Sequence, residues 1–526
     1  MALLLEDRKT LNKLNKLLSI NPGTLEIIGE LEVTTEKEIK EIVEKAKKSF
    51  KEWASLTIKQ RCKYMKKVSD YIMKNLNNIA ELISKENGKP FVEAITADIM
   101  PTLELIDYVI KNSENILSSE NINLGKWNLL NKKSYIEYEP LGVIGIISPW
   151  NFPFSIPMGQ IVMALTCGNC VILKHSEHTP FIGLEIEKVF KESGLPQGVF
   201  SVITGHGLTG SQLVSSGLNK IVFTGSVSTG KKVMETAAKT LTPVVLELGG
   251  KDPMIVLKDV NIDYASSGAV WGAFTNSGQV CASIERVYVH EDIADEFIYE
   301  VVKKTSMLKQ GIGLDKTTDV GAMISLQQLE IVENHVNEAK SKGAKILIGG
   351  QRNLDLPGYF YKPTVLTKVD DSFKIVTDET FGPVMPIMTF KNDDEAIEKA
   401  NNSIYGLSAS IWTKDIEKAK RIASKLQAGS VNINDCLSTY ALCQTPWGGY
   451  KESGIGRTHG KFGFMEFVQP KHIHVDYNYN TKKFWWYKYS QNTIDMFENF
   501  LKFMFSDSKI SSSLKFLEKF SKNKTI

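Results

Sequence analysis

The sequence predicts an α/β protein that contains two successive parallel β-sheet domains. First, 526 residues are too many for one small hydrophobic core, so two or three domains are expected. Second, short apolar runs alternate with segments of helical period, as in parallel sheets that helices cover on both faces. Third, a new series of this kind begins after Gly250.

The N-terminal region is predicted to be mostly helical from Thr35 onward. Thr35 and Glu38 form a capping box, in which each side chain bonds the backbone N–H of the other residue. One apolar face then runs through Ile39, Ile42, Val43, Ala46, Phe50 and Trp53. A helix is therefore expected to begin at this cap.

Residues 1–118 and 138–249 are predicted to form a Rossmann-like dinucleotide-binding domain. Its buried strands are expected at Val143 to Ile147, Val171 to Leu173, Val199 to Ile203, Lys220 to Phe223 and Val244 to Leu246. A helical or turn-forming segment separates each strand from the next. Dinucleotides bind at the carboxyl edge of such sheets, so we expect the cofactor at the ends of these strands.

Residues 250–463 are predicted to form a second α/β domain, which carries the catalytic thiol described below. Its strands are expected at Met254 to Leu257, Arg286 to Val289, Lys345 to Ile348 and Val384 to Met388.

The composition excludes some partners and says little about others. Sixty-three basic and 60 acidic side chains give a net charge of +3, which does not indicate a nucleic-acid-binding protein. Met1 to Ile20 lacks the basic region and long apolar run of a signal peptide, and no stretch is long enough to span a bilayer. A cytoplasmic location is therefore expected.

The six cysteines are expected to be reduced thiols rather than a disulfide framework. Cys167 and Cys170 form a C-x-x-C pair, which could be redox-active or half of a metal site. No second pair or histidine cluster completes a zinc site, so packing is favoured and no metal is predicted.

Three short segments carry groups that suit attack on a carbonyl. Cys281 follows a run of small and polar residues, which gives a thiolate an open approach. Glu247 ends an apolar strand, where partial burial would raise its pKa and make it a general base. Asn151 lies in a proline-rigid loop after the strand Val143 to Ile147, and a fixed amide there can donate to an oxyanion. Taken alone, Cys281 could be an inert buried side chain, Glu247 a solvated turn carboxylate, and Asn151 part of a tight loop.

A phosphate site is expected at Gly225 and Ser226, where a strand meets a helix. Backbone N–H groups at a helix N-terminus favour an anion. The glycine spacing to Gly230 lacks the usual G-x-G-x-x-G fingerprint, so this signal is weak by itself.

Together these segments resemble the aldehyde dehydrogenase superfamily over about residues 30 to 476. The family's motifs are matched, in order, at Pro149 to Pro153, Glu247 to Lys251, Gly278 to Cys281, Glu379 to Val384 and Gly448 to Arg457. Thirty-four positions separate Glu247 from Cys281, which is the spacing that the family uses. The resemblance implies an aldehyde dehydrogenase fold and oxidation of an aldehyde to an acid through a thioester.

The resemblance also implies a role for each matched residue. Cys281 would be the nucleophile, Glu247 the base for deacylation, and Asn151, with the Cys281 backbone N–H, the oxyanion hole. NAD is the implied cofactor, with NADP as the alternative. Lys174 and Glu177 match positions that hold the adenosine ribose. The other matched cofactor contacts are Ser148, Trp150, Gly225, Ser226 for the pyrophosphate, and Glu379 and Phe381 for the nicotinamide ribose and ring.

The same residues argue against other functions within this superfamily. A CoA-acylating relative would lack the glutamate found at Glu247, and a catalytically silent structural or membrane-adaptor homologue would not need the complete reactive set. The overall sequence, including Gly456 to Gly460 and a long C-terminal tail, resembles a bacterial branch of the family that is often labelled succinate-semialdehyde dehydrogenase. Phe154 to Gln160 has no arginine to pair with a second carboxylate. An apolar or fatty aldehyde is therefore predicted, with succinate semialdehyde as the alternative.

The remaining segments predict partners. Residues 119–137 and 464–477 match the family's oligomerisation strands, so a homodimer or tetramer is expected. Residues 478–526 are predicted to form an amphipathic helical tail, which is basic because it has nine lysines and four acidic residues. Its aromatic and basic cluster, Phe484 to Lys488, suits contact with the inner face of a membrane, and packing on the protein or over the substrate tunnel is the alternative. Apolar residues of the expected helices are Phe497, Phe500, Leu501, Met504, Leu514, Leu517 and Phe520.

Overall fold

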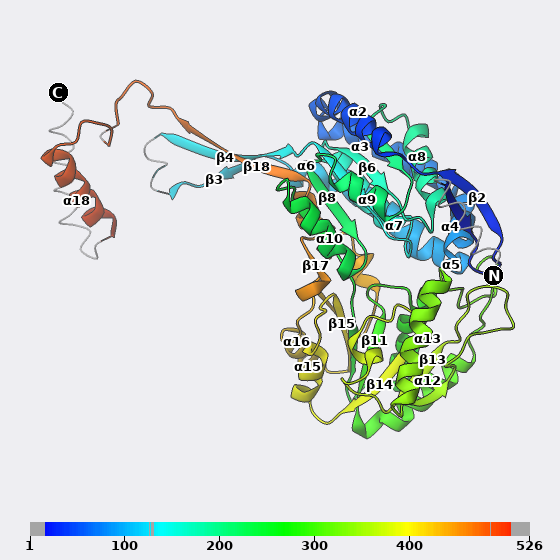
Figure 1. The fold of residues 1–526 in the computed structure, drawn as a ribbon. Coiled ribbons are helices and arrows are strands. Elements are labelled where there is room, and N and C mark those ends of the chain that lie inside the picture. Colours follow the sequence, from blue (N-terminus) through cyan, green and yellow to red (C-terminus); the bar gives the residue numbers. More distant parts are fainter. Residues whose placement is uncertain (1–15, 126, 128–130, 484, 506–526) are drawn as a thin grey trace. The chain divides into compact units, whose positions relative to one another are not determined.

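The computed structural model describes residues 16–125, 127, 131–483 and 485–505 (Figure 1). The chain divides into two compact units. The first comprises the described parts of Met1–Ser118 and Tyr138–Pro470, and the second those of Ser119–Glu137 and Lys471–Ile526. The predicted residues Phe484, Leu514, Leu517 and Phe520 lie outside the described part of the chain.

The first unit holds a six-stranded sheet that contains every strand predicted for the cofactor domain. Its order is β17 (Gly454–Ile455), β9 (Val244–Glu247), β8 (Lys220–Thr224), β5 (Val143–Ile147), β6 (Cys170–Lys174) and β7 (Phe200–Ile203). Neighbouring strands are parallel except β17, which runs antiparallel to β9 and pairs Gly454 with Glu247. The predicted parallel sheet is therefore confirmed, with one antiparallel edge that the sequence did not indicate.

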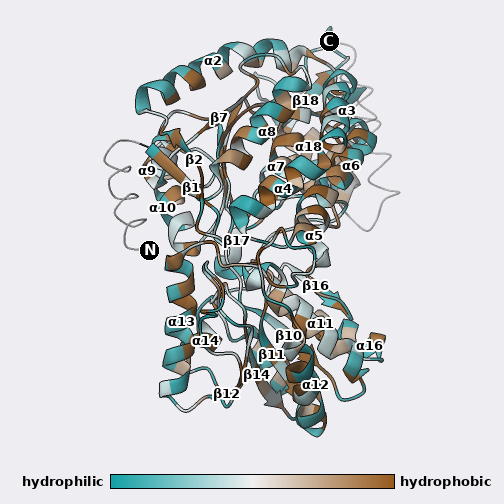
Figure 2. Ribbon diagram, turned by 90° about the vertical axis from the view of Figure 1, so that its right-hand side faces the viewer, coloured by the Kyte–Doolittle hydropathy of each residue, from teal (hydrophilic) through white to brown (hydrophobic). Residues whose placement is uncertain are grey.

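The helices that accompany this sheet differ in how much of their surface is buried. They are α2 (Glu36–Ser55), α3 (Ile58–Lys74), α4 (Leu76–Asn87), α5 (Phe91–Glu93), α6 (Met100–Ile116), α7 (Ser155–Thr166), α8 (Pro180–Glu192), α9 (Gly207–Val214) and α10 (Val227–Ala238). The capping box predicted at Thr35 and Glu38 is present at the start of α2. Brown and teal bands alternate along α2 in Figure 2, as expected of a helix that buries one face.

The N-terminal region also contains a hairpin that the sequence analysis did not predict. Strands β1 (Lys16–Ile20) and β2 (Ile27–Glu32) are antiparallel and precede the first capped helix. Among residues 16–125, the helices therefore begin at the Thr35 cap.

A seven-stranded sheet in the same unit carries the strands predicted after Gly250. Its order is β12 (Lys345–Ile348), β13 (Thr364–Thr367), β14 (Val384–Phe390), β11 (Ile284–His290), β10 (Asp252–Val256), β15 (Ser408–Trp412) and β16 (Ser430–Ile433). The strands β13, β15 and β16 were not predicted. The helices beside it are α11 (Ile262–Phe274), α12 (Ala294–Ser306), α13 (Leu326–Ser341), α14 (Lys374–Thr377), α15 (Asp393–Asn401) and α16 (Ile416–Ala423). Helix α17 (Gly460–Met465) packs instead against α6 and α7 of the cofactor domain.

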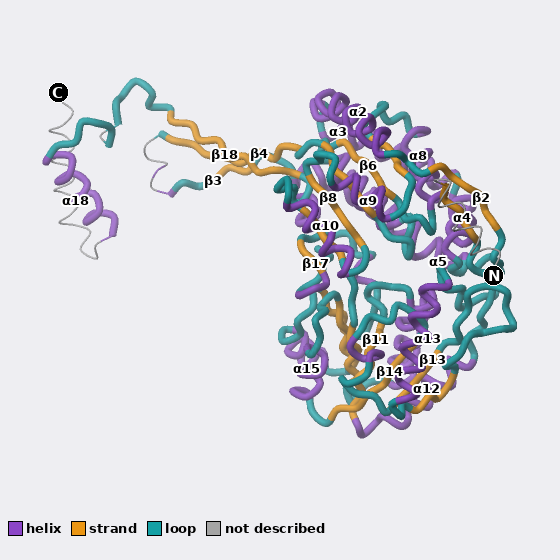
Figure 3. The backbone as a smooth tube through the Cα atoms, viewed as in Figure 1, coloured by secondary structure: helices purple, strands orange, loops and turns teal. Residues whose placement is uncertain are grey.

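A three-stranded ribbon joins the second unit to the first along the chain. Strands β18 (Val468–Asp476), β4 (Lys132–Pro140) and β3 (Glu120–Ile122) run side by side (Figure 3). The prediction that a strand begins at Phe464 is wrong, because Phe464 is fully buried in α17 and the strand starts at Val468. Helix α18 (Gln491–Phe505) follows, where the sequence predicted an amphipathic helix.

Candidate active site

The Cys281 thiol follows a turn whose backbone is left-handed at three successive residues. Helix α11 ends just before this turn, and Asn276 and Ser277 have φ of 48° and 56°. Gly278 follows with a φ of 72°, and a Cβ added there would lie 2.1 Å from the Gly382 carbonyl oxygen. Glycine alone fits so close a backbone approach, so this position fixes the path of the chain into Cys281.

A cavity of about 280 Å³ gathers the predicted reactive groups. It is lined by Pro149, Trp150, Asn151, Ile156, Thr224, Gly225, Ser226, Glu247, Leu248, Gly249, Cys281, Gln328, Ile331, Glu379 and Phe381. The structure therefore brings Asn151, Glu247 and Cys281 together, although they are far apart in the sequence. Of the predicted cofactor residues, Ser148, Lys174 and Glu177 lie outside this lining.

Burial determines the protonation of the Cys281 thiol. Its side chain is partly exposed to the cavity. Burial of the sulfur raises its pKa, and the nearby Asp252 and Glu247 carboxyls raise it further. Because the thiolate and not the thiol attacks a carbonyl, Cys281 must lose its proton before it attacks.

Glu247 is the last residue of β9, and its carboxyl group is 5% exposed. Burial raises its pKa to about 7, although the nearby Thr458 hydroxyl opposes that shift. Its Oε1 atom accepts no hydrogen bond from the described residues. A carboxyl group that titrates near neutral pH, with a free acceptor atom beside a thiol, can serve as a general base.

The Asn151 amide is held at one of its two N–H groups. Nδ2 donates to the Gln279 carbonyl oxygen at 3.2 Å, and the side chain is buried. A primary amide has two N–H donors, so one remains for a second acceptor. Asn151 can therefore present a fixed donor to the cavity that contains Cys281.

The predicted phosphate site has the expected form of a strand followed by a capped helix. Strand β8 ends at Thr224, and Ser226 caps α10 by accepting a hydrogen bond from the Thr229 N–H. A Cβ added to Gly225 would lie 2.6 Å from the Phe223 ring, so a glycine lets that ring pack closely against this turn. The exposed N–H groups of α10 suit a pyrophosphate.

Lys174 and Glu177 lie at the carboxyl end of β6 and form an ion pair at 3.2 Å. Although burial alone would raise the pKa of Glu177, Lys174 and His178 lower it to about 2. Glu177 is therefore a carboxylate at neutral pH. The Ser148 N–H donates to the Lys174 carbonyl oxygen at 3.2 Å, which extends the pairing of β5 with β6 to this edge.

Glu379 and Phe381 form the opposite wall of the cavity. Oε1 of Glu379 accepts the Gly250 N–H at 3.1 Å, and a Cβ on Gly249 would lie 2.3 Å from Oε2. Burial, followed by the Glu285 charge, raises the pKa of Glu379 to about 8. The Phe381 ring packs edge-on against Trp150, with 5.4 Å between ring centroids.

The sequence analysis missed residues that shape or support this wall. Glu285 accepts the Thr380 and Phe381 N–H groups, each at 2.8 Å, and forms a buried ion pair with Lys251 at 2.6 Å. Gln328 donates to the carbonyl oxygens of the same two residues at 3.1 and 3.2 Å. Ile156 and Ile331 were also missed, and each reads locally as an ordinary helix residue.

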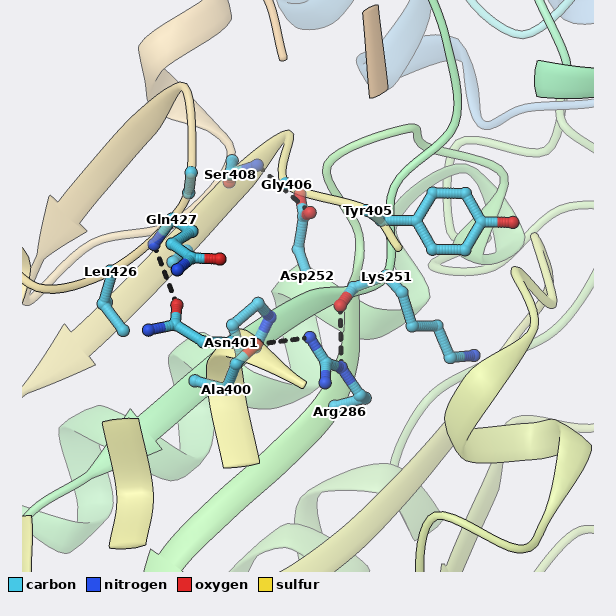
Figure 4. Close-up of a pocket in the computed structure, with 13 residues that line it drawn as sticks. Lys251, Asp252, Arg286, Ala400, Asn401, Tyr405, Gly406, Ser408, Leu426 and Gln427 are labelled. Carbon is cyan, nitrogen blue, oxygen red and sulfur yellow. Dashed lines mark hydrogen bonds between the residues drawn. The ribbon is translucent and has the colours of Figure 1, made fainter. Parts of the chain in front are cut away.

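A second enclosed space adjoins Lys251 and Asp252 (Figure 4). Its volume is only about 10 Å³, enough for one water molecule and no ligand. The Arg286 guanidinium donates to the Lys251 carbonyl oxygen at 2.8 Å and to the Ala400 carbonyl oxygen at 2.9 Å. This space is therefore part of the core that supports the Lys251–Glu285 pair.

The C-x-x-C pair lies away from this chemistry. Cys167 and Cys170 are free and buried, and Cys167 donates to the Phe464 carbonyl oxygen at 3.8 Å. Burial raises the pKa of Cys170 to about 12, so it is a neutral thiol at neutral pH. Within the described ranges, no group of three or more His, Cys, Asp or Glu side chains is placed to hold a metal ion.

The residues present fit a dinucleotide. Gly225 and Gly249 both line the cavity and have no side chain to hinder a ligand, and the α10 N-terminus offers N–H groups. The Glu177 carboxylate can accept hydrogen bonds from ribose hydroxyls.

Comparisons with known proteins agree with this geometry. The family model described as "Aldehyde dehydrogenase family" matches residues 10–473. A 4,4'-diapolycopene aldehyde oxidase from Methylomonas sp is 36% identical over 94% of this chain and 92% of that protein. A betaine aldehyde dehydrogenase from Bacillus subtilis (strain 168) is 37% identical over 86% of this chain and 93% of that protein. The solved NAD+ complex of an aldehyde dehydrogenase from Bacillus cereus has a TM-score of 0.84 and 36% identity over 88% of this chain and 94% of that one.

Proposed function

This chain belongs to the aldehyde dehydrogenase family, and from that membership we propose that it oxidises an apolar aldehyde to a carboxylic acid through a thioester on Cys281. It is an NAD(P)-dependent enzyme, and structures of its relatives contain NAD+. The observation that carries the proposal is the single cavity shared by Cys281, Glu247 and Asn151. We further assign residues 1–118 and 138–249 to cofactor binding and residues 250–463 to catalysis.

Each reactive side chain has one task in this proposal. The Cys281 thiol first gives up its proton to solvent, and its thiolate then adds to the carbonyl carbon. The new oxyanion accepts hydrogen bonds from the Asn151 amide and the Cys281 backbone N–H. This carbon would then give up a hydride, for which NAD, held by Glu177, Ser226 and Glu379, would supply the acceptor. The thioester that remains is attacked by water, from which Glu247 takes a proton. The acid then leaves and the thiolate is restored.

Glu247 favours hydrolysis over transfer of the acyl group to CoA. It is buried beside Cys281, with a pKa near 7, so it can be deprotonated when water attacks. A thiol acceptor would not need this base. The complete reactive set also argues against a silent homologue.

The surroundings of Cys281 favour an apolar substrate. Beside the sulfur lies a buried apolar cluster of Val280, Ala282, Leu407 and Trp447, onto which Phe152, Leu437 and Tyr440 also pack. Burial, followed by the charge of Glu247, raises the pKa of Tyr440 far above its usual range, so its phenol stays neutral. One relative is named a 4,4'-diapolycopene aldehyde oxidase, and this name does not indicate a charged aldehyde.

A cationic aldehyde is the competing substrate, because other relatives are betaine or aminoaldehyde dehydrogenases. Aromatic rings can bind such a cation. In this chain, however, Lys89 Nζ lies 4.2 Å from the centroid of the Phe152 ring, so one face of that ring already holds a cation. We therefore rank a neutral aldehyde above a cationic one.

Succinate semialdehyde is the other competing substrate. The resemblance to the branch labelled with that activity rests on the overall sequence, including Gly456 to Gly460 and the long C-terminal tail, and the relatives described above carry other names. Helix α7, which follows the asparagine loop, is buried at all 12 positions and has no charged side chain. A second carboxylate would find no cation on this helix.

A substrate panel tests the function directly. We expect NADH formation with hexanal and decanal, and kcat/KM at least about tenfold lower with betaine aldehyde and succinate semialdehyde, which is about 1.4 kcal/mol of discrimination. NADH absorbance under saturating NAD gives the rates. A higher kcat/KM for either charged aldehyde would reverse the substrate assignment. No NADH with any aldehyde, from reduced protein with either cofactor, would refute the enzymatic function.

We also expect NAD to be preferred over NADP. The Glu177 carboxylate, with its pKa lowered to about 2, is charged at neutral pH and would repel a 2′-phosphate. The variant Glu177→Ser removes this charge and should raise kcat/KM for NADP about tenfold relative to NAD. The matched control is Glu185→Ser in α8, the helix that follows Glu177. It should leave the ratio of kcat/KM for NADP to kcat/KM for NAD unchanged. Equal preference in the wild type would contradict the assignment.

We propose that the chain forms a homodimer or a tetramer. Strand β18 is an edge strand of its sheet, and four of its residues in succession are exposed. A long exposed edge invites pairing with another strand, here from a second copy.

We propose that the C-terminal tail makes peripheral contact with a membrane, on the inner face if the chain is cytoplasmic. Ile494, Leu501 and Phe505 of α18 are 51%, 53% and 77% exposed. None of the described helices is both long and apolar enough to cross a bilayer. Packing on protein has support too, since Trp485 lies edge-on to Trp127 at 6.2 Å.

Truncation after Tyr477 distinguishes these roles for the tail. The full chain should co-sediment with vesicles that contain anionic lipid, because lysines and apolar side chains both favour that surface. The truncated chain should lose this binding and keep its activity on hexanal. If the full chain never binds vesicles, the membrane proposal is wrong. Loss of activity on decanal alone would identify the tail as a cover of the substrate tunnel.

A further inference from the structure

Three buried side chains hold the backbone of the asparagine loop. Asn87 Nδ2 donates to the Trp150 carbonyl oxygen at 2.8 Å, and Lys89 Nζ donates to the Asn151 carbonyl oxygen at 2.8 Å. Asn276 Nδ2 donates to the same Asn151 oxygen at 2.9 Å. The peptide group after the proposed oxyanion donor is therefore fixed from two sides, by the segment before α5 and by the turn before Cys281.

Lys89 belongs to a fully buried ion pair that reaches the other end of this loop. Its Nζ lies 2.7 Å from Asp98 Oδ2, and both side chains are 0% exposed. Asp98 Oδ1 accepts the Phe154 N–H at 3.1 Å and the Ser155 N–H at 3.0 Å. These N–H groups belong to the start of α7 and have no partner within their own helix. The pair therefore clamps both ends of the segment that follows Asn151.

The scaffold fixes both members of the pair. Asp98 lies on a π-helical segment, Ala94–Ile99, where one extra residue per turn shifts the register between α5 and α6. A Cβ on Gly313 would lie 2.1 Å from the Lys89 carbonyl oxygen, and a Cβ on Gly321 would lie 2.2 Å from the Gly88 carbonyl oxygen. Two glycine segments therefore pack directly against the backbone that carries Lys89.

We propose that the Lys89–Asp98 pair positions Asn151 for catalysis, an inference that rests on the oxyanion role proposed for Asn151. A buried ion pair is a poor source of stability, because both charges lose their hydration. The Lys89–Asp98 pair instead forms hydrogen bonds with both ends of the loop: Lys89 with the Asn151 carbonyl oxygen, and Asp98 with two backbone N–H groups at the start of α7. Lys89 also lies against the Phe152 ring, so the same cation orients the residue that packs near Cys281. Displacing an oxyanion donor by about 1 Å can slow a reaction about 100-fold.

The test compares Lys89→Met, Asp98→Asn and the double variant. Each single variant leaves a buried charge or acceptor without its partner, so reduced thermal stability is expected. The double variant removes both charges and should regain most of the lost stability. It still lacks the Lys89 donor to the Asn151 carbonyl oxygen. We expect its single-turnover rate of NADH formation to stay about 10- to 100-fold below that of the wild type, with the dissociation constant for NAD unchanged.

Two further variants calibrate that result. Lys220→Met removes another buried lysine of an ion pair, with Glu466, away from the loop, and should leave the single-turnover rate unchanged in the folded protein. Asn151→Ala should slow that rate about 100-fold or more. If Asn151→Ala is fully active, the oxyanion assignment itself fails. If Asn151→Ala is slow but the stable double variant reacts at the wild-type rate, the pair is only structural and the positioning role is wrong.

Discussion

Cys281→Ala is expected to abolish NADH formation, with a loss of at least about 10⁴-fold in kcat. No other described residue of the cavity offers a thiol, so the variant cannot form the thioester. The Asn151 amide and the bound cofactor remain, but without a covalent bond to sulfur the aldehyde carbon does not become a hydride donor. NADH absorbance at saturating aldehyde and NAD measures the loss.

The matched control for this variant is Cys62→Ala. Cys62 is a buried thiol of α3, outside the cavity lining, and bonds the Ser113 hydroxyl at 3.4 Å. Its removal should leave the rate per folded molecule unchanged. Mass spectrometry after quenching should show an acyl adduct on wild-type Cys281 and none on the Cys281→Ala variant. Wild-type turnover by Cys281→Ala would overturn the assignment of the nucleophile.

Much of the fold could be predicted because its signals are local. The capping box at Thr35 depends on two residues three positions apart, and the buried strands of both sheets are continuous apolar runs. Glu247 lies at the end of one such strand and Asn151 lies in the loop after another, so both could be predicted from the sequence. Parallel strands end at the same edge of a sheet, so their following residues meet there.

Other features depend on contacts that no local pattern records. Lys89 follows a glycine and precedes a proline, as many lysines in surface turns do. It is nevertheless fully buried, because its ammonium group pairs with Asp98 and donates to the Asn151 carbonyl oxygen. Glu285 reads as one polar residue of a strand, and its role appears only where it meets the Thr380 and Phe381 N–H groups. Strand β17 has two residues and exists only by pairing with β9.

The start of strand β18 also depends on contacts between residues that are distant in the sequence. The match to the family's oligomerisation strands began at Phe464, but Phe464 is fully buried within the short helix α17. Its carbonyl oxygen accepts the Cys167 thiol, and the Phe467 carbonyl oxygen accepts Asn169 Nδ2 at 2.8 Å. Tertiary packing therefore decided where the strand begins.

Glu247→Gln is expected to separate formation of the acyl-enzyme from its hydrolysis. The amide is close in shape to the carboxyl group but cannot take a proton from water, so steady-state kcat should fall about 10²- to 10⁴-fold. The first turnover needs Cys281 and Asn151, and a burst of about one NADH per active site should remain. Rapid mixing followed by steady-state recording measures both phases.

The pH dependence of Glu247 supplies the control for that experiment. Only the carboxylate can act as a base, so wild-type kcat should rise with pH through the Glu247 pKa of about 7 and then level off. Because burial raises this pKa above its ordinary value, the folded state holds the proton more tightly than the unfolded state. The resulting contribution to stability is complete below about pH 4.5 and is lost as pH rises through about 7. In Glu247→Gln both effects should vanish, so its residual kcat should not rise near pH 7, and its free energy of unfolding should fall less across that range than that of the wild type. A variant that keeps the wild-type kcat and its rise near pH 7 would show that another group activates the water.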